Sequence, residues 1–155
     1  YGNAATSVLD PLIKLQKKLI RNVFGIKFGS HTNKAFAELE ILKLPDLIER
    51  NNCVLAFKIW YDTAPKNICQ DFKPIHTTIY NTRVIDQLQF DVPICKKAGL
   101  EVVPAFAISK SWNNLEVNIK RRTKIKIFKE AVSAAYFARY REIPDCSMKG
   151  CYSCS

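Results

Sequence analysis

The sequence contains no run of about 18 uncharged apolar residues, which excludes a membrane-spanning helix. A Gly-rich phosphate loop, a G-x-S-x-G turn and an H-E-x-x-H pair are also absent. Only two histidines occur, neither beside an obvious nucleophile, and no Asp-Asp pair is present to hold two metal ions. These absences favour a binding or scaffolding role, and we expect no catalytic residues in this chain.

The first residues, YGNAATSVLD, lack the basic and apolar regions of a secretory signal and lack an initiating Met. We therefore expect a piece of a longer or processed polypeptide. Cys53, Cys69 and Cys95 stand singly among apolar residues, as buried free thiols do. A reducing, intracellular location fits them, in the cytoplasm and nucleus, although an even number of cysteines leaves disulfides as an alternative.

Cys146, Cys151 and Cys154 near the C-terminus have the spacing C-x4-C-x2-C. A Cys-x2-Cys pair is half of many zinc sites. Only three thiols are present and no histidine is near, so a fourth ligand would have to come from Asp145 or the distant His76. The tail therefore predicts either a zinc site or a reduced, frayed end.

The net charge of +10 is unevenly distributed. Residues 1–30 carry five bases and one acid, and residues 120–155 carry nine bases and three acids. Residues 31–75 and 76–119 are each neutral. Cationic surfaces on a neutral body favour polyanionic partners, of which RNA and DNA are the commonest.

Residues 10–25 predict an amphipathic helix, with Asp10 as N-cap, Pro11 at the first position and Gly25 at the end. At the helical period its apolar side chains share one face: Leu12, Leu15, Leu19, Ile20 and Val23. Its cations share nearly the opposite face: Lys14, Lys17, Lys18 and Arg21. We expect the apolar face to pack and the cations to form a nucleic-acid contact or a solvated surface.

Residues 31–62 predict a short helix capped by Thr32 or Ser30, a turn, and a longer helix opened by Pro45. Trp60 and Tyr61 close that helix, as core side chains or as platforms for stacked bases. Near residues 87–103, alternating polar and apolar residues on either side of KKAG predict a small β-hairpin.

The last long element is a helix near residues 123–140, capped by Thr123. Five cations stand at its start: Lys120, Arg121, Arg122, Lys124 and Lys126. Cations at a helix N-terminus oppose its dipole, so a bound anion would stabilise them. We expect these residues to contact a polyanion or to be a solvated helix start.

These elements predict an α+β fold that is mostly α, in one compact region, residues 1–140. It divides into a helical part (1–75), a connector (76–86) and a hairpin with a helix (87–140), and a Cys-containing tail (141–155) follows. The connector contains HTTIYNTR. We expect Tyr80 to pack or stack, and Arg83 to contact either a phosphate or a structural carbonyl.

Five motifs follow one another along the chain: LQKKLIR, HTNKAFAELEILKLPDL, HTTIYNTR, FAISKSWNNL and FKEAV. This order resembles the region that follows the polymerase core in reverse transcriptases of non-LTR retrotransposons, the LINE-type, jockey-like branch. The opening YGNAA is similar to the W-G-N-A that trails the thumb in that family. Trp112-Asn113-Asn114-Leu115 keeps the family's W-N-x-L but lacks the proline that follows it, and the last helix lacks the Lys-rich end.

The resemblance implies the non-catalytic C-terminal region of an RNA-directed DNA polymerase encoded by a transposable element. Such a region would bind template RNA and target DNA in target-primed reverse transcription and contact the upstream polymerase core. Mg²⁺ would serve the parent polymerase, not this chain. The alternative is a stand-alone basic helical module, derived from such an element, that binds nucleic acid or an acidic protein.

Overall fold

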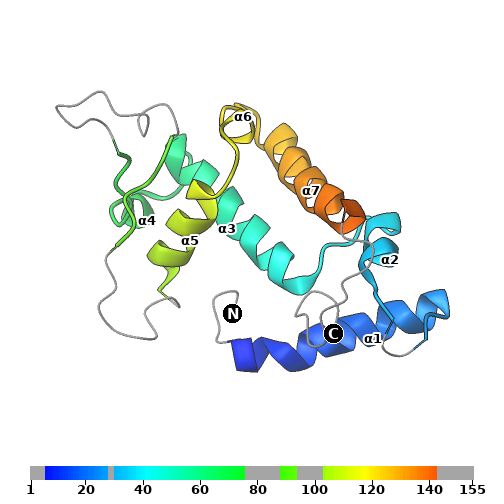
Figure 1. Cartoon of the computed structure of the whole chain (residues 1–155). Helices are drawn as coiled ribbons and strands as arrows, with labels where there is room; N and C mark the ends of the chain where they lie inside the picture. The colour runs from blue at the N-terminus through cyan, green and yellow to red at the C-terminus, as the bar shows by residue number, and fades with distance from the viewer. Residues whose placement is uncertain (1–5, 28–29, 76–87, 94–102, 143–155) are drawn as a thin grey trace. The chain divides into compact units, whose positions relative to one another are not determined.

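The computed structural model describes residues 6–27, 30–75, 88–93 and 103–142. Seven helices and no strand occur in this part of the chain (Figure 1), so the mainly α architecture is confirmed. The chain divides into unit 1 (Tyr1–Ala4 and Ile48–Ala131) and unit 2 (Ala5–Leu47 and Val132–Ser155). The helices are α1 (Thr6–Phe24), α2 (Asn33–Glu38), α3 (Leu44–Trp60), α4 (Lys66–Cys69), α5 (Pro104–Asn113), α6 (Val117–Lys120) and α7 (Ile125–Glu142).

Helix α1 in unit 2 ends where the sequence predicts and begins earlier. Gly25 has φ +62°, and the amide of Ile26 donates to the carbonyl of Arg21 at 2.9 Å, the bond pattern of a Schellman motif. The predicted start at Asp10 is wrong, since the helix begins at Thr6 and contains Pro11. A proline removes a single backbone bond, and here the helix continues through it.

Unit 2 is held together by buried polar contacts around two rings. The ring of Phe36 on α2 meets the ring of Tyr140 on α7 edge to face, 6.4 Å between centroids. The Tyr140 hydroxyl accepts a hydrogen bond from the amide of Lys43 at 3.1 Å and donates to the carboxylate of Asp46. Burial, and secondarily that bond to Asp46, raise the pKa of Tyr140.

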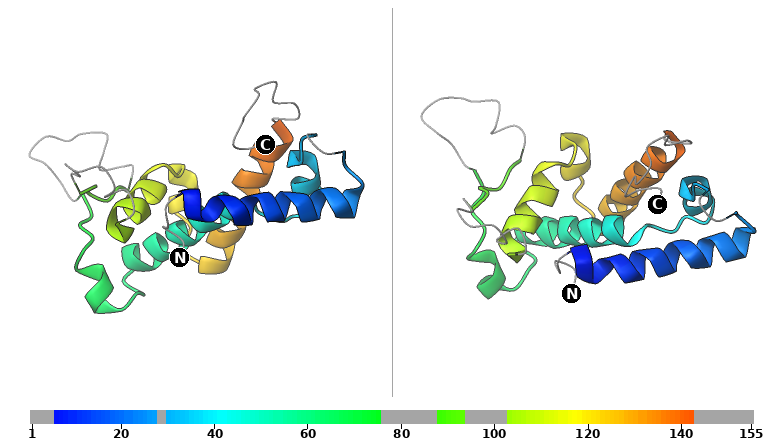
Figure 2. Two further views of the ribbon diagram at one scale, coloured as in Figure 1. Left: turned by 90° about the horizontal axis from the view of Figure 1, so that it is seen from below. Right: turned by 60° about the horizontal axis from the view of Figure 1, so that its bottom comes forward.

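A glutamine attaches α1 to the rest of unit 2. The Gln16 side chain donates to the carbonyl of Leu42 at 3.0 Å and accepts from the amide of Leu44 at 2.9 Å. Helix α2 lies beside α1 within this unit (Figure 2). These two bonds fix which face of α1 turns inward.

The predicted N-cap residue of α2 is confirmed, but the capping hydrogen bond is not. Thr32 occupies the N-cap position, but its hydroxyl makes no capping bond. Its backbone has φ −109° and ψ −1°, whereas a capping Thr normally adopts the extended region that aims its oxygen at the first turn.

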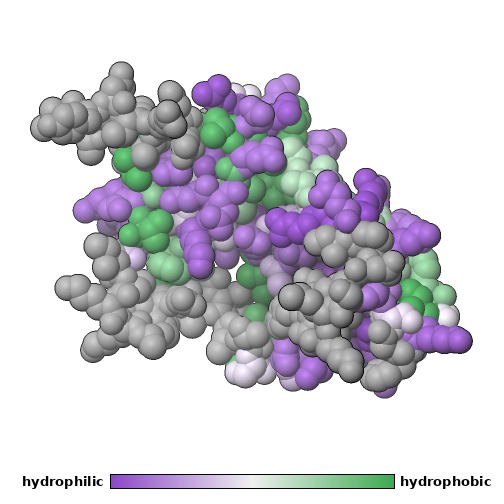
Figure 3. All heavy atoms as spheres, in the orientation of Figure 1, coloured by the Kyte–Doolittle hydropathy of each residue, from purple (hydrophilic) through white to green (hydrophobic). Residues whose placement is uncertain are grey.

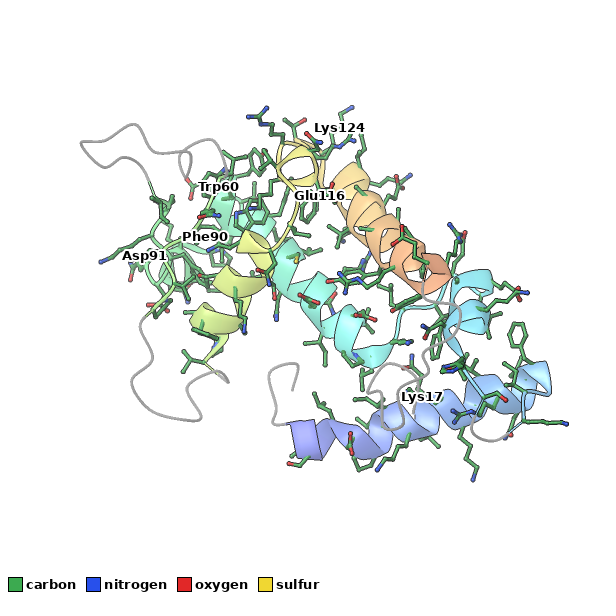
Figure 4. All side chains as sticks on the ribbon, viewed as in Figure 1. Lys17, Trp60, Phe90, Asp91, Glu116 and Lys124 are labelled. Atoms are coloured by element: carbon green, nitrogen blue, oxygen red, sulfur yellow. The ribbon has the colours of Figure 1, made fainter. Side chains whose placement is uncertain are left out.

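Unit 1 is built around aromatic rings. Trp112 on α5 is fully buried and stacks on Trp60 of α3, 5.8 Å between centroids, with Phe90 and Phe128 also against it. Figure 4 labels Trp60 and Phe90, whose rings meet edge to face at 5.2 Å. Trp112 thus lies in the core, the predicted core role of Trp60 is confirmed, and α5 lies beside α3 (Figure 1).

The structure does not support the β-hairpin predicted near residues 87–103. Residues 94–102 lie outside the described part of the chain. In the described part, Phe90 forms an isolated antiparallel bridge with Pro74 instead. The amide of Ile75 donates to the carbonyl of Gln89 at 2.9 Å, and the amide of Asp91 donates to that of Lys73 at 2.8 Å. The alternating pattern marks a half-buried extended segment, but its pairing partner is distant in sequence.

Of the remaining predicted elements, some lie within the described residues and others lie outside them. Residues 66–69, directly after Pro65, form the short helix α4, and the predicted last helix is α7. Helix α7 begins at Ile125, so its N-cap is Lys124 and not the predicted Thr123. The connector 76–86 and nearly all of the tail lie outside the described residues, and the division of residues 1–140 stays a prediction. No helix of the described part has the length and apolarity to cross a bilayer.

Candidate nucleic-acid interface

Four exposed cations follow one another where α6 gives way to α7 in unit 1. We call them the basic corner: Arg121, Arg122, Lys124 and Lys126. Figure 4 labels Lys124 in this turn, and in Figure 3 largely hydrophilic side chains cover the upper edge, where Figure 1 places α6 and the start of α7. Within the described ranges, no acidic side chain forms an ion pair with any of the four.

The backbone of the basic corner is fixed by a chain of hydrogen bonds. Helix α6 starts after Glu116, whose carbonyl accepts from the amide of Lys120 at 3.2 Å. The amide of Arg121 then donates to the carbonyl of Val117 at 3.0 Å, and the Tyr61 hydroxyl donates to the carbonyl of Lys120 at 3.2 Å. The short helix thus ends in a defined turn that presents Arg121 on its surface.

Lys120, predicted to contact nucleic acid, lies inside unit 1. Its side chain is 1% exposed, its Nζ donates to the carbonyl of Asn113 at 3.2 Å, and the Trp112 ring centroid is 5.9 Å away. Burial lowers the pKa of Lys120 to about 8, against the partly opposing influence of Cys53. A buried ammonium with these contacts joins α6 to α5, so it positions the basic corner and does not reach a phosphate.

Sequence reasoning missed the residues that anchor this part of unit 1. The Asn113 side chain donates a hydrogen bond to the carbonyl of Phe90 at 2.8 Å and accepts one from the amide of Phe90 at 2.9 Å. The indole Nε1 of Trp112 donates to the carbonyl of Leu88 at 2.7 Å. The available signal was the Trp-Asn pair in the SWNNL motif, since an asparagine can satisfy both backbone groups of an extended residue.

The electrostatics of the basic corner favour an anion. Lys124 is the N-cap of α7, and its carbonyl accepts from the amide of Phe128 at 3.0 Å. The positive end of the α7 dipole therefore lies among the exposed cations of the corner. A phosphate placed there would interact favourably with both, and guanidinium groups such as those of Arg121 and Arg122 bind phosphate oxygens in pairs.

The four cations predicted on α1 do not form one exposed stripe. Lys17, labelled in Figure 4, is 2% exposed and packs into unit 2 with its long apolar stem. Arg21 is half-buried and donates to the carbonyl of Ser30 at 3.2 Å. Lys14 and Lys18 remain exposed, and Lys14 Nζ lies 3.3 Å from the Asp10 carboxylate. Helix α1 thus offers two accessible cations where the sequence predicted four.

The packing face predicted for α1 is wrong as well. Ile13 and Ile20 are the buried apolar residues, at 4% and 6% exposure, together with Lys17. Ile20 alone belongs to the predicted set. The other four are exposed: Leu12, Leu15, Leu19 and Val23.

Two predicted groups lie outside the described residues, namely Arg83 and the cysteines Cys146, Cys151 and Cys154. In the described part of the chain no cluster of three or more histidine, cysteine or acidic side chains is arranged to hold a metal. Zinc at the tail therefore stays a prediction. Cys53 is a buried free thiol, as expected, and burial raises its pKa to about 12, which makes it a poor nucleophile. Cys69 is also a free thiol but only half-buried, and Cys95 lies outside the described residues.

No protein-family model, curated protein or solved structure matches the chain. The function therefore has to be argued from the chain's own residues.

Proposed function

We propose that this chain is a nucleic-acid-binding region in which the basic corner contacts the phosphates of RNA or DNA. The observation that carries the proposal is the set of four exposed cations within six residues, without acidic partners in the described residues, at the N-terminal end of an 18-residue helix. Phosphate contacts account for most sequence-independent binding of nucleic acids. The resemblance in motif order supports the same role, as the non-catalytic C-terminal region of a retrotransposon RNA-directed DNA polymerase.

The arrangement suits backbone contact better than base recognition. The Trp60 ring packs against the Trp112 ring in the core. The Tyr61 ring packs on Phe57, 4.6 Å between centroids, and its hydroxyl donates to the carbonyl of Lys120. Neither ring is therefore a stacking platform that stands free of the protein. We accordingly expect binding with little sequence preference and a strong dependence on salt.

The test is binding of the purified chain to a labelled structured RNA, a single-stranded DNA and a duplex DNA across a salt series. One variant neutralises the basic corner: Arg121→Gln, Arg122→Gln, Lys124→Gln and Lys126→Gln. A matched control removes the same charge from exposed lysines elsewhere in unit 1: Lys58→Gln, Lys66→Gln, Lys73→Gln and Lys110→Gln.

For duplex DNA, we expect the slope of log affinity against log salt concentration to become less steep by about 3 to 4 in the basic-corner variant. The control variant should change this slope far less. Equal losses in both variants would mean that net charge, not a site, attracts the nucleic acid. Unchanged binding by a folded basic-corner variant would refute the proposal.

The polymerase context has its own test. If the encoding DNA continues upstream into a reading frame with a Tyr/Phe-x-Asp-Asp motif, the chain is part of a reverse transcriptase. A reading frame without that motif would favour the stand-alone module.

A further inference from the structure

Thr123 stands between the cations of the basic corner, and the fold does not use its hydroxyl. The sequence predicts Thr123 as the N-cap of α7, but Lys124 occupies that position. The Thr123 side chain is exposed, and within the described residues no hydrogen bond engages it. The hydroxyl is therefore accessible to an enzyme that modifies it.

The charge around Thr123 distinguishes it from the other accessible hydroxyls. In the described ranges four Ser or Thr side chains are exposed, namely Ser7, Ser30, Thr63 and Thr123. Thr123 alone has a cation on each side, Arg122 before it and Lys124 after it. The nearest acids in the sequence are Glu116 and Glu130, each seven residues away. An enzyme that selects its substrate by positive charge would therefore select Thr123 among these four.

The backbone around Thr123 can be reached as well. Residues 122–124 belong to neither helix, since α6 ends at Lys120 and α7 begins at Ile125. A protein kinase takes the acceptor and its neighbours into a cleft, which an exposed non-helical stretch allows and a helix interior does not. Protein kinases choose among substrates partly by charge pattern, and carboxylates in the cleft would complement the exposed cations on both sides of the acceptor.

The reaction would move the γ-phosphoryl group of a nucleoside triphosphate to Thr123. A bond forms between Thr123 Oγ1 and the γ-phosphorus, the bond from that phosphorus to the bridging oxygen breaks, and the nucleoside diphosphate leaves. The hydroxyl proton passes to a catalytic carboxylate of the kinase. At pH 7 the product carries a charge of about −1.5 to −2 on the threonine.

A phosphate at this position would compete with nucleic acid for the same cations. The guanidinium groups of Arg121 and Arg122 can bind its oxygens, and the positive end of the α7 dipole lies one residue further along the chain. The added charge would offset about two of the four positive charges of the basic corner. Fewer phosphates of an RNA or DNA backbone would then be neutralised there.

We propose that Thr123 is a phosphorylation site for a protein kinase that recognises basic substrates, and that its phosphate weakens the binding of nucleic acid at the basic corner. The effect on binding rests on the proposed function of the chain. The assignment of the phosphorylation site does not, so the two statements are tested by separate measurements.

The first measurement is phosphate transfer from ATP to the whole folded chain by protein kinase C, an enzyme that selects basic substrates. Mass spectrometry of the digested chain locates the phosphate. We expect it at Thr123, and we expect Thr123→Val to lose it. Thr63→Val is the matched control, because Thr63 is also an exposed threonine of unit 1 but follows Asp62 and donates to the carbonyl of Lys58 at 3.1 Å. This control should keep the phosphate at Thr123, and a folded parent chain without phosphate at Thr123 would refute the site.

The second measurement compares the unmodified and the phosphorylated chain in binding duplex DNA across a salt series. The slope of log affinity against log salt concentration should become less steep by about 1.5 to 2, and the affinity at about 0.1 M salt should fall at least about tenfold. Thr123→Glu, with a single negative charge, should change the slope by about 1, whereas the uncharged Thr123→Gln of the same size should leave it unchanged.

Two outcomes separate the statements. Unchanged DNA binding by the fully phosphorylated chain would refute the effect of the phosphate while the site at Thr123 stands. A chain that binds no DNA in either form would refute the proposed function and with it the effect on binding, whereas mass spectrometry would still decide the phosphorylation site. Circular dichroism of each variant shows whether it has the helix content of the parent chain.

Discussion

The two units of this chain reach stability by different means. Unit 1 closes an aromatic core in which Trp112 touches three other rings, and its polar contacts serve to place that ring. Unit 2 joins its helices through buried polar groups around Phe36 and Tyr140, while α1 leaves its richest apolar face exposed. The comparison teaches that residue type alone does not decide burial: Lys120 is buried in unit 1 and Lys17 and Lys43 in unit 2, whereas three leucines of α1 are exposed in unit 2.

Replacing the central ring of unit 1 should have the largest effect. Trp112→Ala removes a fully buried indole and its bond to Leu88, and should lower the free energy of unfolding by about 3 to 5 kcal/mol. Urea denaturation followed by circular dichroism measures this. Ile127→Ala, at a side chain on α7 that is 42% exposed, is the control and should change stability by less than about 1 kcal/mol. Similar losses in both would mean that the aromatic cluster is not the core.

The buried lysine of unit 1 should make stability depend on pH. The folded pKa of Lys120 is about 8 and its unfolded value is 10.5, so between these values the unfolded chain binds more protons. The free energy of unfolding should therefore rise with pH across this window, by about 3 kcal/mol. Lys120→Met has no such proton to release and should lack the rise.

Other groups titrate in the same range and have to be held constant. Cys53, beside Lys120 and Glu49, has its pKa raised from 9.0 to about 12, so it makes the free energy of unfolding fall above pH 9. The comparison of Lys120 with Lys120→Met is therefore made in a Cys53→Ala background, from pH 8 to 10. Parallel pH profiles in that background would show that Lys120 is solvated.

Removing the Tyr140 hydroxyl should lower the stability of unit 2. Tyr140→Phe keeps the ring against Phe36 but leaves the Lys43 amide and the Asp46 carboxylate without this partner. Unfolding free energy should fall by about 1 to 3 kcal/mol. Phe137→Leu, at a half-buried ring that meets the Tyr140 ring edge to face at 6.1 Å, tests the packing of Tyr140 separately from these bonds. A neutral Tyr140→Phe would show that the network contributes nothing beyond packing.

The smallest effect should come from the exposed face of α1. Leu15→Ala, at a side chain 54% exposed, should change unfolding free energy by under about 1 kcal/mol, whereas Ile13→Ala on the inward face should lower it by about 2 to 4 kcal/mol. Thermal denaturation of the two variants measures the difference. The opposite order would mean that the leucines are the packing face after all.

The sequence by itself determined most of the helices and the location of the charge. Helical period, prolines and Gly25 predicted α1, α3 and α7 to within a few residues at most ends, because these signals act within a turn or two of the chain. The sequence also predicted that Arg121 and Arg122 are exposed, because adjacent charged side chains are rarely buried together.

Only the tertiary structure decided which face of each helix is covered. The period of α1 defines a leucine face correctly, but Gln16 binds the 42–44 backbone and turns Ile13 and Lys17 inward instead. Lys120 is buried because a carbonyl and an indole from α5 receive it, and Phe90 pairs with Pro74 and not with its sequence neighbours. Each of these outcomes depends on a partner in another element of the chain, and the local pattern of residues does not record that partner.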